Sequence, residues 1–360
     1  MKSRPTKILV VDDSALYRQS IQNVLREYEG AQTVGSAKNG VDALEKIERL
    51  DPDLLTLDVQ MPDMNGIELL REIKRRKLRP KAIMVSSFTA AGTQVTTDAL
   101  MEGAFDFILK PSGSDSGANR QQLQDELQEK ISAFRESSDT VRTSKRVTRQ
   151  PVGDNGLAEK VPAPKSPCRV VVLGTSTGGP VALKALLPKL PAELPIPLLV
   201  VQHMPPTYTQ SLAVRLNSIC ELEVVEATNN MEAIAGRVIL AAGGQQMKLI
   251  SRAGRLLVQV TDAPPENSVR PSVDYTLRST VEATGGNALA VIMTGMGRDG
   301  LEGCRGLKQA GGYVFAQNQS DCVVFGMPKA VIEQNLADRT LPLAKLAPAI
   351  VRHIKRSRRA

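Results

Sequence analysis

Carboxylates at the ends of apolar stretches form the first group of residues that could do chemistry. Asp12 and Asp13 directly follow KILVV, and Asp58 ends DLLTLD. Carboxylates that meet at one place repel each other unless a proton or a cation lies between them, and a hard divalent ion such as Mg²⁺ accepts such oxygen ligands. Asp58 could then attack phosphorus as a carboxylate nucleophile. The competing role for any one of these residues is a helix N-cap.

A hydroxyl and an ammonium group follow two further apolar stretches. Ser86 ends KAIMVS, and Lys110 ends FDFILK. In an open parallel sheet, strand ends of this kind meet at one edge, where ligands bind. Lys110 could pair with an added phosphate and Ser86 could donate a hydrogen bond to it. The pattern predicts an aspartyl-phosphate site, with Asp58 as the phosphorylated residue and Mg²⁺ at Asp12, Asp13 and Asp58.

A serine at a glycine-rich turn forms the second group. The stretch VVVLGTSTGGP fits G-x-S-x-G between an apolar run and a helix, a context that exposes Ser176. Serine is a weak nucleophile and needs a base beside it. Of the two histidines, His353 lies in the basic C-terminal segment, whereas His203 follows the next apolar stretch. We therefore predict that His203 is the base, although a lone histidine is more often a plain core or surface residue.

A carboxylate must hold the imidazole ring and stabilise its protonated form. Asp299 is the favoured residue because ALAVIMTGMGRDG is an apolar stretch followed by a glycine-rich turn. In that turn, the backbone N–H of Met296 could receive an oxyanion. The competing role of Asp299 is an N-cap for the next helix. The other candidate acids in this half of the chain are Asp262, Asp274 and Asp321.

A phosphate cradle is the main competing function for the turn at Ser176. A dinucleotide site needs an acid at the end of the next strand, but that stretch ends at Gln202 and His203. A P-loop needs Gly-Lys followed by Ser or Thr, which this turn lacks. The sequence therefore favours the nucleophile over nucleotide binding.

The pattern of apolar stretches predicts the elements that must position these residues. From residue 7 to residue 110, apolar runs alternate with helical patterns, which is typical of a parallel sheet covered on both faces. A last helix is expected over about residues 119–134. From residue 168 the rhythm resumes, with GGQQMKLI and GRLLVQV as a predicted hairpin. We thus predict a second doubly wound α/β domain, mainly parallel with an antiparallel portion.

Composition sets the domain limits and excludes several classes. Hydrophobic residues are 42% and charged residues 23%, as in globular proteins. Residues 137–167 carry a net charge of +3 and residues 352–360 carry +5, which accounts for the whole net charge of +8. The basicity thus lies in a linker and a tail rather than on a folded surface that reads DNA. The predicted parts are a first domain, a linker, a second domain and a basic tail, at residues 1–136, 137–167, 168–354 and 355–360.

The cellular setting is expected to be the cytoplasm. The start of the chain lacks a secretory apolar segment, and no stretch approaches the ~18 apolar residues of a membrane span. The four cysteines are scattered, which favours free thiols in a reducing compartment. We expect neither nucleic-acid binding nor membrane insertion.

The first half of the chain resembles a receiver domain of two-component response regulators. The resemblance covers about residues 5–134 and rests on VVDDS, LDVQMPDMNG, MVSS and FILKP. It implies a flavodoxin-like, five-stranded parallel sheet and transfer of phosphate from a sensor histidine kinase to Asp58. Ser86 stands where the family has Thr or Ser. Phe107 occupies the aromatic switch position, which is often Tyr, so that a hydroxyl is missing there.

The second half looks like the catalytic domain of the chemotaxis protein-glutamate methylesterases. This resemblance covers about residues 168–350 and rests on GTSTGGP, VQHMPPTYTQSLAVRL, VRPSVDYTLRS, VIMTGMGRDG and GGYVFAQNQSDCVVFGMP. Three residues match the catalytic triad and two match positions that line the active site. They are Ser176, His203 and Asp299 for the triad, and Thr177 and Met296 for the lining.

The second resemblance implies hydrolysis of glutamate γ-methyl esters on the cytoplasmic helices of chemoreceptors, with deamidation of glutamines as a related reaction and no metal in this domain. It also implies that the receiver covers the site until Asp58 is phosphorylated. Two rival hypotheses remain open. One is a DNA-binding output, which would need a basic helix-turn-helix domain of perhaps 60–100 residues. The other is a catalytically silent scaffold.

Overall fold

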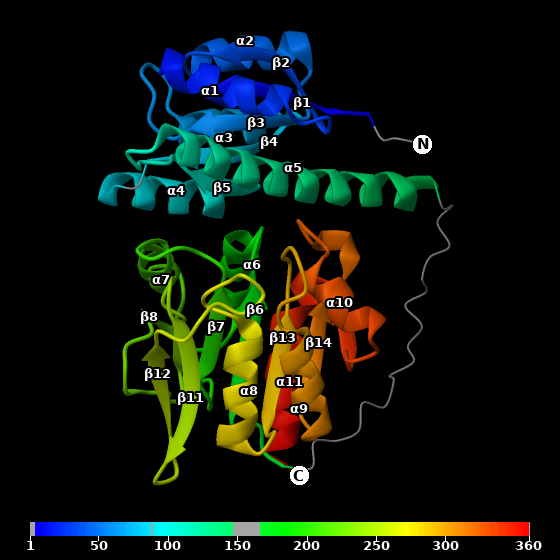
Figure 1. Ribbon diagram of the computed structural model, residues 1–360. Coiled ribbons are helices and arrows are strands. Elements are labelled where there is room, and N and C mark those ends of the chain that lie inside the picture. Colours follow the sequence, from blue (N-terminus) through cyan, green and yellow to red (C-terminus); the bar gives the residue numbers. More distant parts are fainter. Residues whose placement is uncertain (1–3, 88, 147–165, 360) are drawn as a thin grey trace. The chain divides into compact units, whose positions relative to one another are not determined.

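The computed structural model describes residues 4–87, 89–146 and 166–359 (Figure 1). The chain divides into two compact units, Met1–Arg146 and Val147–Ala360. Each unit contains its own sheet flanked by helices.

The first unit is built on a five-stranded sheet with the strand order β2-β1-β3-β4-β5, and all of its strand pairs are parallel. The central strands are buried almost throughout, which explains their continuous apolar sequences. The edge strand β2 has the mixed sequence AQTVGSA and is mostly half-buried, so its pattern is weaker. The strands are β1 (Thr6–Val11), β2 (Ala31–Ala37), β3 (Leu54–Asp58), β4 (Lys81–Ser86) and β5 (Asp106–Leu109).

Helices cover both faces of this sheet. Helix α1 packs against α5, whereas α2 and α4 both pack against α3. Helix α5 continues well beyond the predicted range of 119–134, because no Gly or Pro interrupts residues 118–146. It therefore takes in the first part of the predicted linker, and residues 147–165 of that linker lie outside the described residues. The helices are α1 (Ala15–Arg26), α2 (Gly40–Leu50), α3 (Gly66–Arg75), α4 (Ala90–Glu102) and α5 (Ser116–Arg146).

The second unit contains a seven-stranded parallel sheet and a three-stranded antiparallel sheet. The strand orders are β15-β14-β13-β6-β7-β10-β8 and β11-β12-β9. Strands β11 and β12 pair as neighbours in an antiparallel hairpin, as the sequence predicts. The strands are β6 (Val170–Thr175), β7 (Leu198–Gln202), β8 (Glu223–Glu226), β9 (Met231–Glu232), β10 (Arg237–Leu240), β11 (Gln246–Arg252), β12 (Arg255–Thr261), β13 (Ala288–Ile292), β14 (Tyr313–Gln317) and β15 (Arg339–Leu341).

The order of the seven strands places a switch point at β6. After β6 the chain builds β7, β8 and β10 on one side, and it later returns to build β13, β14 and β15 on the other side. In open α/β sheets, ligands bind at the carboxyl ends of the strands on either side of such a point. The ends of β6, β7 and β13 are therefore the expected place for a site (Figure 1).

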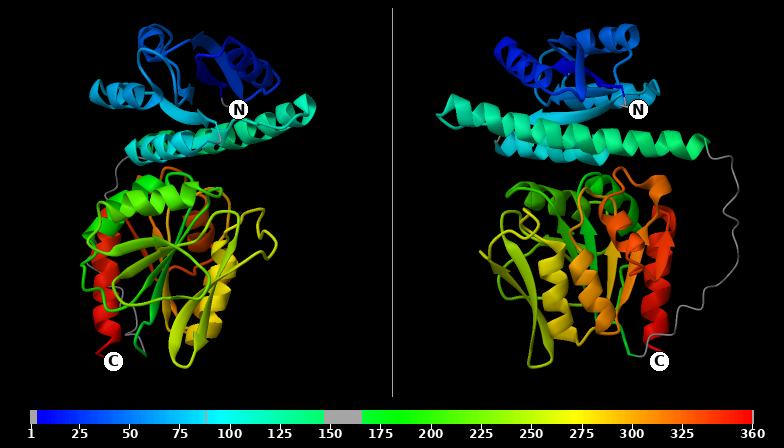
Figure 2. Two further views of the ribbon diagram at one scale, coloured as in Figure 1. Left: turned by 90° about the vertical axis from the view of Figure 1, so that its left-hand side faces the viewer. Right: turned by 45° about the vertical axis from the view of Figure 1, so that its right-hand side comes forward.

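Helices also flank the larger sheet. Helix α6 packs against α7 and α11, whereas α9 packs against α8 and α10, so the two groups lie on opposite faces (Figure 2). The α-helices are α6 (Gly179–Leu186), α7 (Tyr208–Asn217), α8 (Val273–Thr284), α9 (Leu301–Gln309), α10 (Met327–Glu333) and α11 (Leu343–Ser357), and the 3-10 helices are η1 (Leu187–Lys189) and η2 (Gln319–Asp321).

The C-terminal segment differs from the exposed basic stretch that its composition suggested. Helix α11 runs through to Ser357, and His353 is buried, with its ring 4.7 Å from the ring of Tyr313 and 5.6 Å from that of Phe315. The helical repeat turns His353 and its apolar neighbours toward the core and the cations toward solvent. Burial, the largest cause, lowers the pKa of His353 to about 4.

No helix in the described ranges combines the length and the apolar character that crossing a membrane requires.

Candidate functional sites at two sheet edges

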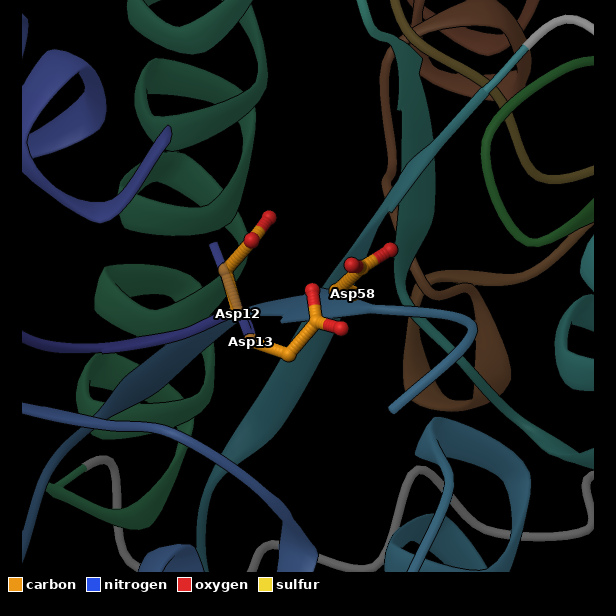
Figure 3. A group of neighbouring side chains, drawn as sticks. All are labelled: Asp12, Asp13 and Asp58. Atoms are coloured by element: carbon orange, nitrogen blue, oxygen red, sulfur yellow. The ribbon is translucent and has the colours of Figure 1, made fainter. Parts of the chain in front are cut away.

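In the first unit, the predicted carboxylates meet one ammonium group at the carboxyl edge of the sheet. Asp12 follows β1 and is fully buried, and Asp58 ends β3. The Nζ atom of Lys110, which follows β5, lies 2.8 Å from Oδ2 of Asp12 and 2.9 Å from Oδ2 of Asp58. Figure 3 shows Asp13 projecting toward the same place as Asp12 and Asp58. One ammonium thus pairs with two of the three carboxylates gathered at this edge.

These three carboxylates fit a divalent cation. One oxygen from each of Asp12, Asp13 and Asp58 lies within 4.8 Å of the others (Figure 3). Burial raises the pKa of Asp58 and the charge of Asp12 adds to the rise, while the hydrogen bond from Lys110 opposes it. The cluster is therefore short of positive charge, and its donors are the hard oxygens that Mg²⁺ prefers.

Ser86, the predicted hydroxyl partner, is engaged with helix α4 in this structure. It is fully buried at the end of β4. Its Oγ atom lies 2.8 Å from Oγ1 of Thr96. Phe107, at the predicted switch position, is half-buried on β5.

Tyr17 contributes to this edge without having been predicted. Its ring lies 4.6 Å from Nζ of Lys110, within the range of a cation–π contact, and its hydroxyl donates to the carbonyl of Pro111 over 3.3 Å. The residue stands in the first turn of α1, whose N-cap is Ser14. The position of Tyr17 in the first turn of a helix gives no sequence signal for this role, because its partners, Lys110 and Pro111, come from a distant part of the chain.

In the second unit, the sheet register brings Ser176 and His203 side by side. Thr175 pairs with Gln202 across β6 and β7, so the next residue on each strand is Ser176 and His203. Gln202, almost fully buried, donates through Nε2 to the carbonyls of Ser176 (3.0 Å) and His203 (3.2 Å), and its Oε1 accepts from Oγ1 of Thr175 (2.7 Å). One side chain therefore ties the two strand ends together.

The end of β13 packs against the turn that carries Ser176. The backbone N–H of Ser176 donates to the carbonyl of Thr294 over 3.0 Å. A Cβ added at Gly295 would lie 2.8 Å from Cβ of Ser176 and 2.3 Å from Sδ of Met327, so only glycine allows this approach. Gly178 has a φ of +78°, which lets the chain turn sharply into α6.

Asp299 completes the arrangement by binding the imidazole ring. Its Oδ2 lies 2.8 Å from Nε2 of His203, which leaves Nδ1 as the ring nitrogen for other partners. Of the candidate acids, Asp299 is the one that contacts His203. Asp262 is exposed, Asp321 accepts from the backbone N–H of Leu343, and the backbone N–H of Asp274 donates to Oδ1 of Asp299 over 3.1 Å.

Backbone and hydroxyl donors surround the Asp299 carboxylate. It accepts from Oγ of Ser272 (2.8 Å) and from the backbone N–H groups of Val273 (2.6 Å) and Gly300 (3.0 Å). Burial by itself would raise its pKa, but the hydrogen bonds from His203 and from the first turn of α8 outweigh burial, so that the pKa is lowered. The carboxylate of Asp299, for which a cap of α9 was the competing role, thus mainly accepts hydrogen bonds at the start of α8. The dipole at the N-terminus of α8 also stabilises its negative charge.

The two predicted lining residues lie on the turns next to Ser176. Thr177 is buried, and its carbonyl accepts from Oγ1 of Thr294 over 2.9 Å. Met296 is half-buried and stands between Gly295 and Gly297, whose φ is +77°.

Comparison with known families assigns both units. Residues 171–350 match the family model of CheB methylesterase, and residues 8–122 match that of the response regulator receiver domain. The chain belongs to the CheB methylesterase family. It is 42% identical over 358 residues to a protein-glutamate methylesterase/protein-glutamine glutaminase of Desulfotalea psychrophila, with 97% of this chain and 98% of the relative covered.

A protein sequence and a crystal structure from Thermotoga maritima support the assignment to this family. A protein-glutamate methylesterase/protein-glutamine glutaminase of that organism is 41% identical over 352 residues, covering 98% of this chain and 99% of the relative. The crystal structure of the Thermotoga maritima CheB methylesterase catalytic domain superimposes with a TM-score of 0.50 at 43% identity, covering 51% of this chain and 97% of that one.

Sequence reasoning about this CheB family member missed several supporting residues. Gln202 was noted only as the end of an apolar stretch, although a polar residue in the last position of a buried strand is a usable signal. Thr294 ends the equivalent stretch before its glycine turn. Ser272 and Asn267, which both contact Asp299, come from a loop that has no periodic pattern.

Proposed function

We propose that this chain is a phosphorylation-controlled serine esterase, which hydrolyses glutamate γ-methyl esters on the cytoplasmic helices of chemoreceptors to glutamate and methanol. The observation that carries the proposal is the hydrogen bond from His203 to Asp299 beside Ser176 on the adjoining strand end. The names of the relatives support methyl esters of protein glutamates as the substrate class and add deamidation of protein glutamines as a second reaction. We place the reaction in the cytoplasm.

The roles of the three residues follow from their order at the sheet edge. The hydroxyl oxygen of Ser176 attacks the ester carbonyl carbon while Nδ1 of His203 accepts the hydroxyl proton, because Nε2 is held by Asp299. The proton then passes to the methoxy oxygen, and methanol leaves. Water attacks the acyl group with His203 again as base, which releases glutamate and restores Ser176.

The negative charge that develops on the carbonyl oxygen needs fixed donors. We assign this role to the backbone N–H groups of Thr177 and Met296, since both residues lie on turns that contact Ser176 or its neighbours. Loss of one such donor typically costs about 3 kcal/mol of transition-state stabilisation.

The receiver supplies control. Asp58 would accept a phosphoryl group from a sensor histidine kinase, and Lys110, now paired with Asp12 and Asp58, would hold that group. Mg²⁺ bound by Asp12, Asp13 and Asp58 would neutralise the charge that gathers there. Phosphorylation needs only to bias an equilibrium between a covered and an open esterase site.

Methanol release from methylated receptor preparations, with and without a phosphodonor, tests the proposal. S176A should lose at least about 10³-fold in rate, whereas S251A, which alters an exposed serine at the end of β11, should keep the wild-type rate. A serine-reactive phosphonate should label the wild type and S251A but not S176A. Activity retained in S176A would contradict the assignment, and salt-dependent binding to duplex DNA would favour the rival output.

A further inference from the structure

A tight turn behind the proposed triad adopts an unusual backbone conformation. Glu266 and Val269 exchange both backbone hydrogen bonds, at 3.1 and 2.9 Å, across a two-residue loop. The loop residues Asn267 and Ser268 have φ values of +51° and +64°. Two consecutive positive φ values define a type I′ turn, for which Asn is among the favoured first residues. An ion pair between Arg278 and Glu266 ties the base of the turn to α8.

This turn presents a carboxamide to two buried carboxylates. Nδ2 of Asn267 donates to Oδ1 of Asp299 over 3.1 Å and to Oδ2 of Asp274 over 2.9 Å. A carboxamide nitrogen carries two hydrogens, and these two contacts account for both. Asn267 is therefore a neutral side chain that donates to both carboxylates.

The second carboxylate stands where a charge is costly. Asp274 is 4% exposed, and its Oδ1 accepts from the backbone N–H of Gly303 over 2.7 Å. Burial raises its pKa and the charge of Asp299 adds to the rise, while the hydrogen bonds from Gly303 and Asn267 oppose it. The titratable groups that face Asp274 are Asp299 and, on α9, the buried thiol of Cys304, whose pKa is raised by burial.

We propose that Asn267 is a positioning residue for the esterase: its carboxamide fixes the orientation of Asp299 toward His203 and joins Asp299 to Asp274 through a neutral donor. The inference rests on the proposed function, because it concerns the same triad. Its physical basis is that Asp299 must hold one oxygen toward the imidazole during the reaction, and a bridge anchored on a rigid turn restricts rotation of the carboxylate.

The first arm of the test removes the bridge and keeps the turn. N267G retains a residue that adopts positive φ without cost but has no amide. We expect kcat to fall about tenfold and KM to change less than about twofold, as for the loss of a hydrogen bond to a charged group that orients a catalytic residue. S268G, the neighbouring position in the same turn, is the matched control and should keep the wild-type kcat.

The second arm changes the charge behind the triad in opposite directions. N267D adds a carboxylate beside Asp299, and D274N removes one. An added negative charge stabilises the protonated imidazole, so activity should be lost at a higher pH in N267D and at a lower pH in D274N, each by about half a pH unit. A residue that only filled space would not move the acid limb of the kcat/KM profile in this ordered way.

The outcomes separate this inference from the function on which it rests. If S176A keeps its activity, the triad itself is wrong. If S176A is inactive and all three variants fold by their heat-unfolding midpoints, two results would overturn the role of Asn267. They are a kcat of N267G equal to that of S268G, and acid limbs of N267D and D274N that coincide or move in the same direction.

Discussion

The two sheet edges use the same topological position and balance charge in opposite ways. At the edge of the first unit, three carboxylates gather around one ammonium that pairs with two of them, and burial raises the pKa of Asp58. At the edge of the second unit, donors surround Asp299, and its pKa is lowered. Under the proposed function, the first edge would accept a cation and a phosphoryl group from outside. The second edge holds the charge of Asp299 with hydrogen-bond donors from the chain itself.

Removal of divalent ions is the strongest way to separate the two edges. With excess EDTA, the full chain should take up no phosphate from a small phosphodonor, because the crowded carboxylates then lack their cation. Basal ester hydrolysis should be unchanged. Phosphate uptake is measured by label on the protein and hydrolysis by methanol release. D58N with Mg²⁺ present is the control for label at other residues, and a metal requirement of the basal reaction would break the comparison.

The substitution D299N should have the opposite pattern: ester hydrolysis should fall and phosphate uptake should be unchanged. It keeps the shape of the side chain but removes the charge that orients and stabilises the imidazole, so kcat should fall by about 10³ to 10⁴. Phosphate label on Asp58 should remain at the wild-type level. A drop in both activities would show that the chain had unfolded, and a drop in neither would exclude Asp299 from the triad.

The close approach of the end of β13 to Ser176 predicts that G295A lowers the esterase rate, by less than D299N does. In G295A the added methyl group would meet Met327 and Ser176, so the turn has to move. Displacements of about 1 Å in a catalytic site cost about 10² in rate. G306A is the matched control, since an added Cβ there meets nothing within 4 Å, and its rate should equal that of the wild type.

Stability should respond to pH with opposite signs at the two edges. Asp58 has a folded pKa above its ordinary value of 3.8, so its ionisation weakens the first unit as the pH rises above 3.8 and through the folded pKa, and D58N should be the more stable form at pH 7. Asp299 has a lowered pKa, so its contribution is present at pH 7 and is lost in acid as the pH falls through the folded value. D299N should therefore destabilise the second unit.

Each effect on stability is expected to be about 1–3 kcal/mol. Hydrogen exchange measures it in the peptides of β3 for D58N and of α8 for D299N, which reports on each unit separately. Changes of the same sign in the two variants would contradict the difference between the edges.

The sequence predicted most of the architecture, and the failures lie where burial is uneven. Fully buried parallel strands such as β1 and β3 are continuous apolar runs, so their pattern is plain. Strand β2 lies at an edge, and its mixed residues gave no comparable signal. Helix α5 is longer than its sequence pattern predicts, because the polar composition of its last turns is typical of a linker although nothing in that stretch stops a helix.

The residues at the strand ends were predictable, whereas those that support them were not. Ser176, His203 and Asp299 follow apolar stretches, so parallel topology alone brings them to one edge. Asn267 reaches the same place from a loop whose path depends on tertiary contacts. The catalytic roles of Ser176, His203 and Asp299 stay predictions until the variants are measured. The same holds for the roles of Thr177 and Met296.

The bridge formed by Gln202 has a consequence for how this protein can be switched. Because the amide of Gln202 donates to the carbonyls just beyond both strand ends, the proposed nucleophile Ser176 and the proposed base His203 cannot be drawn apart without breaking these hydrogen bonds. Under the proposed function, a regulatory signal would act on two residues whose backbones are already held side by side. Such a signal would control the access of a protein substrate to the site. Small esters should therefore be hydrolysed at nearly the same rate in the phosphorylated and the unphosphorylated chain.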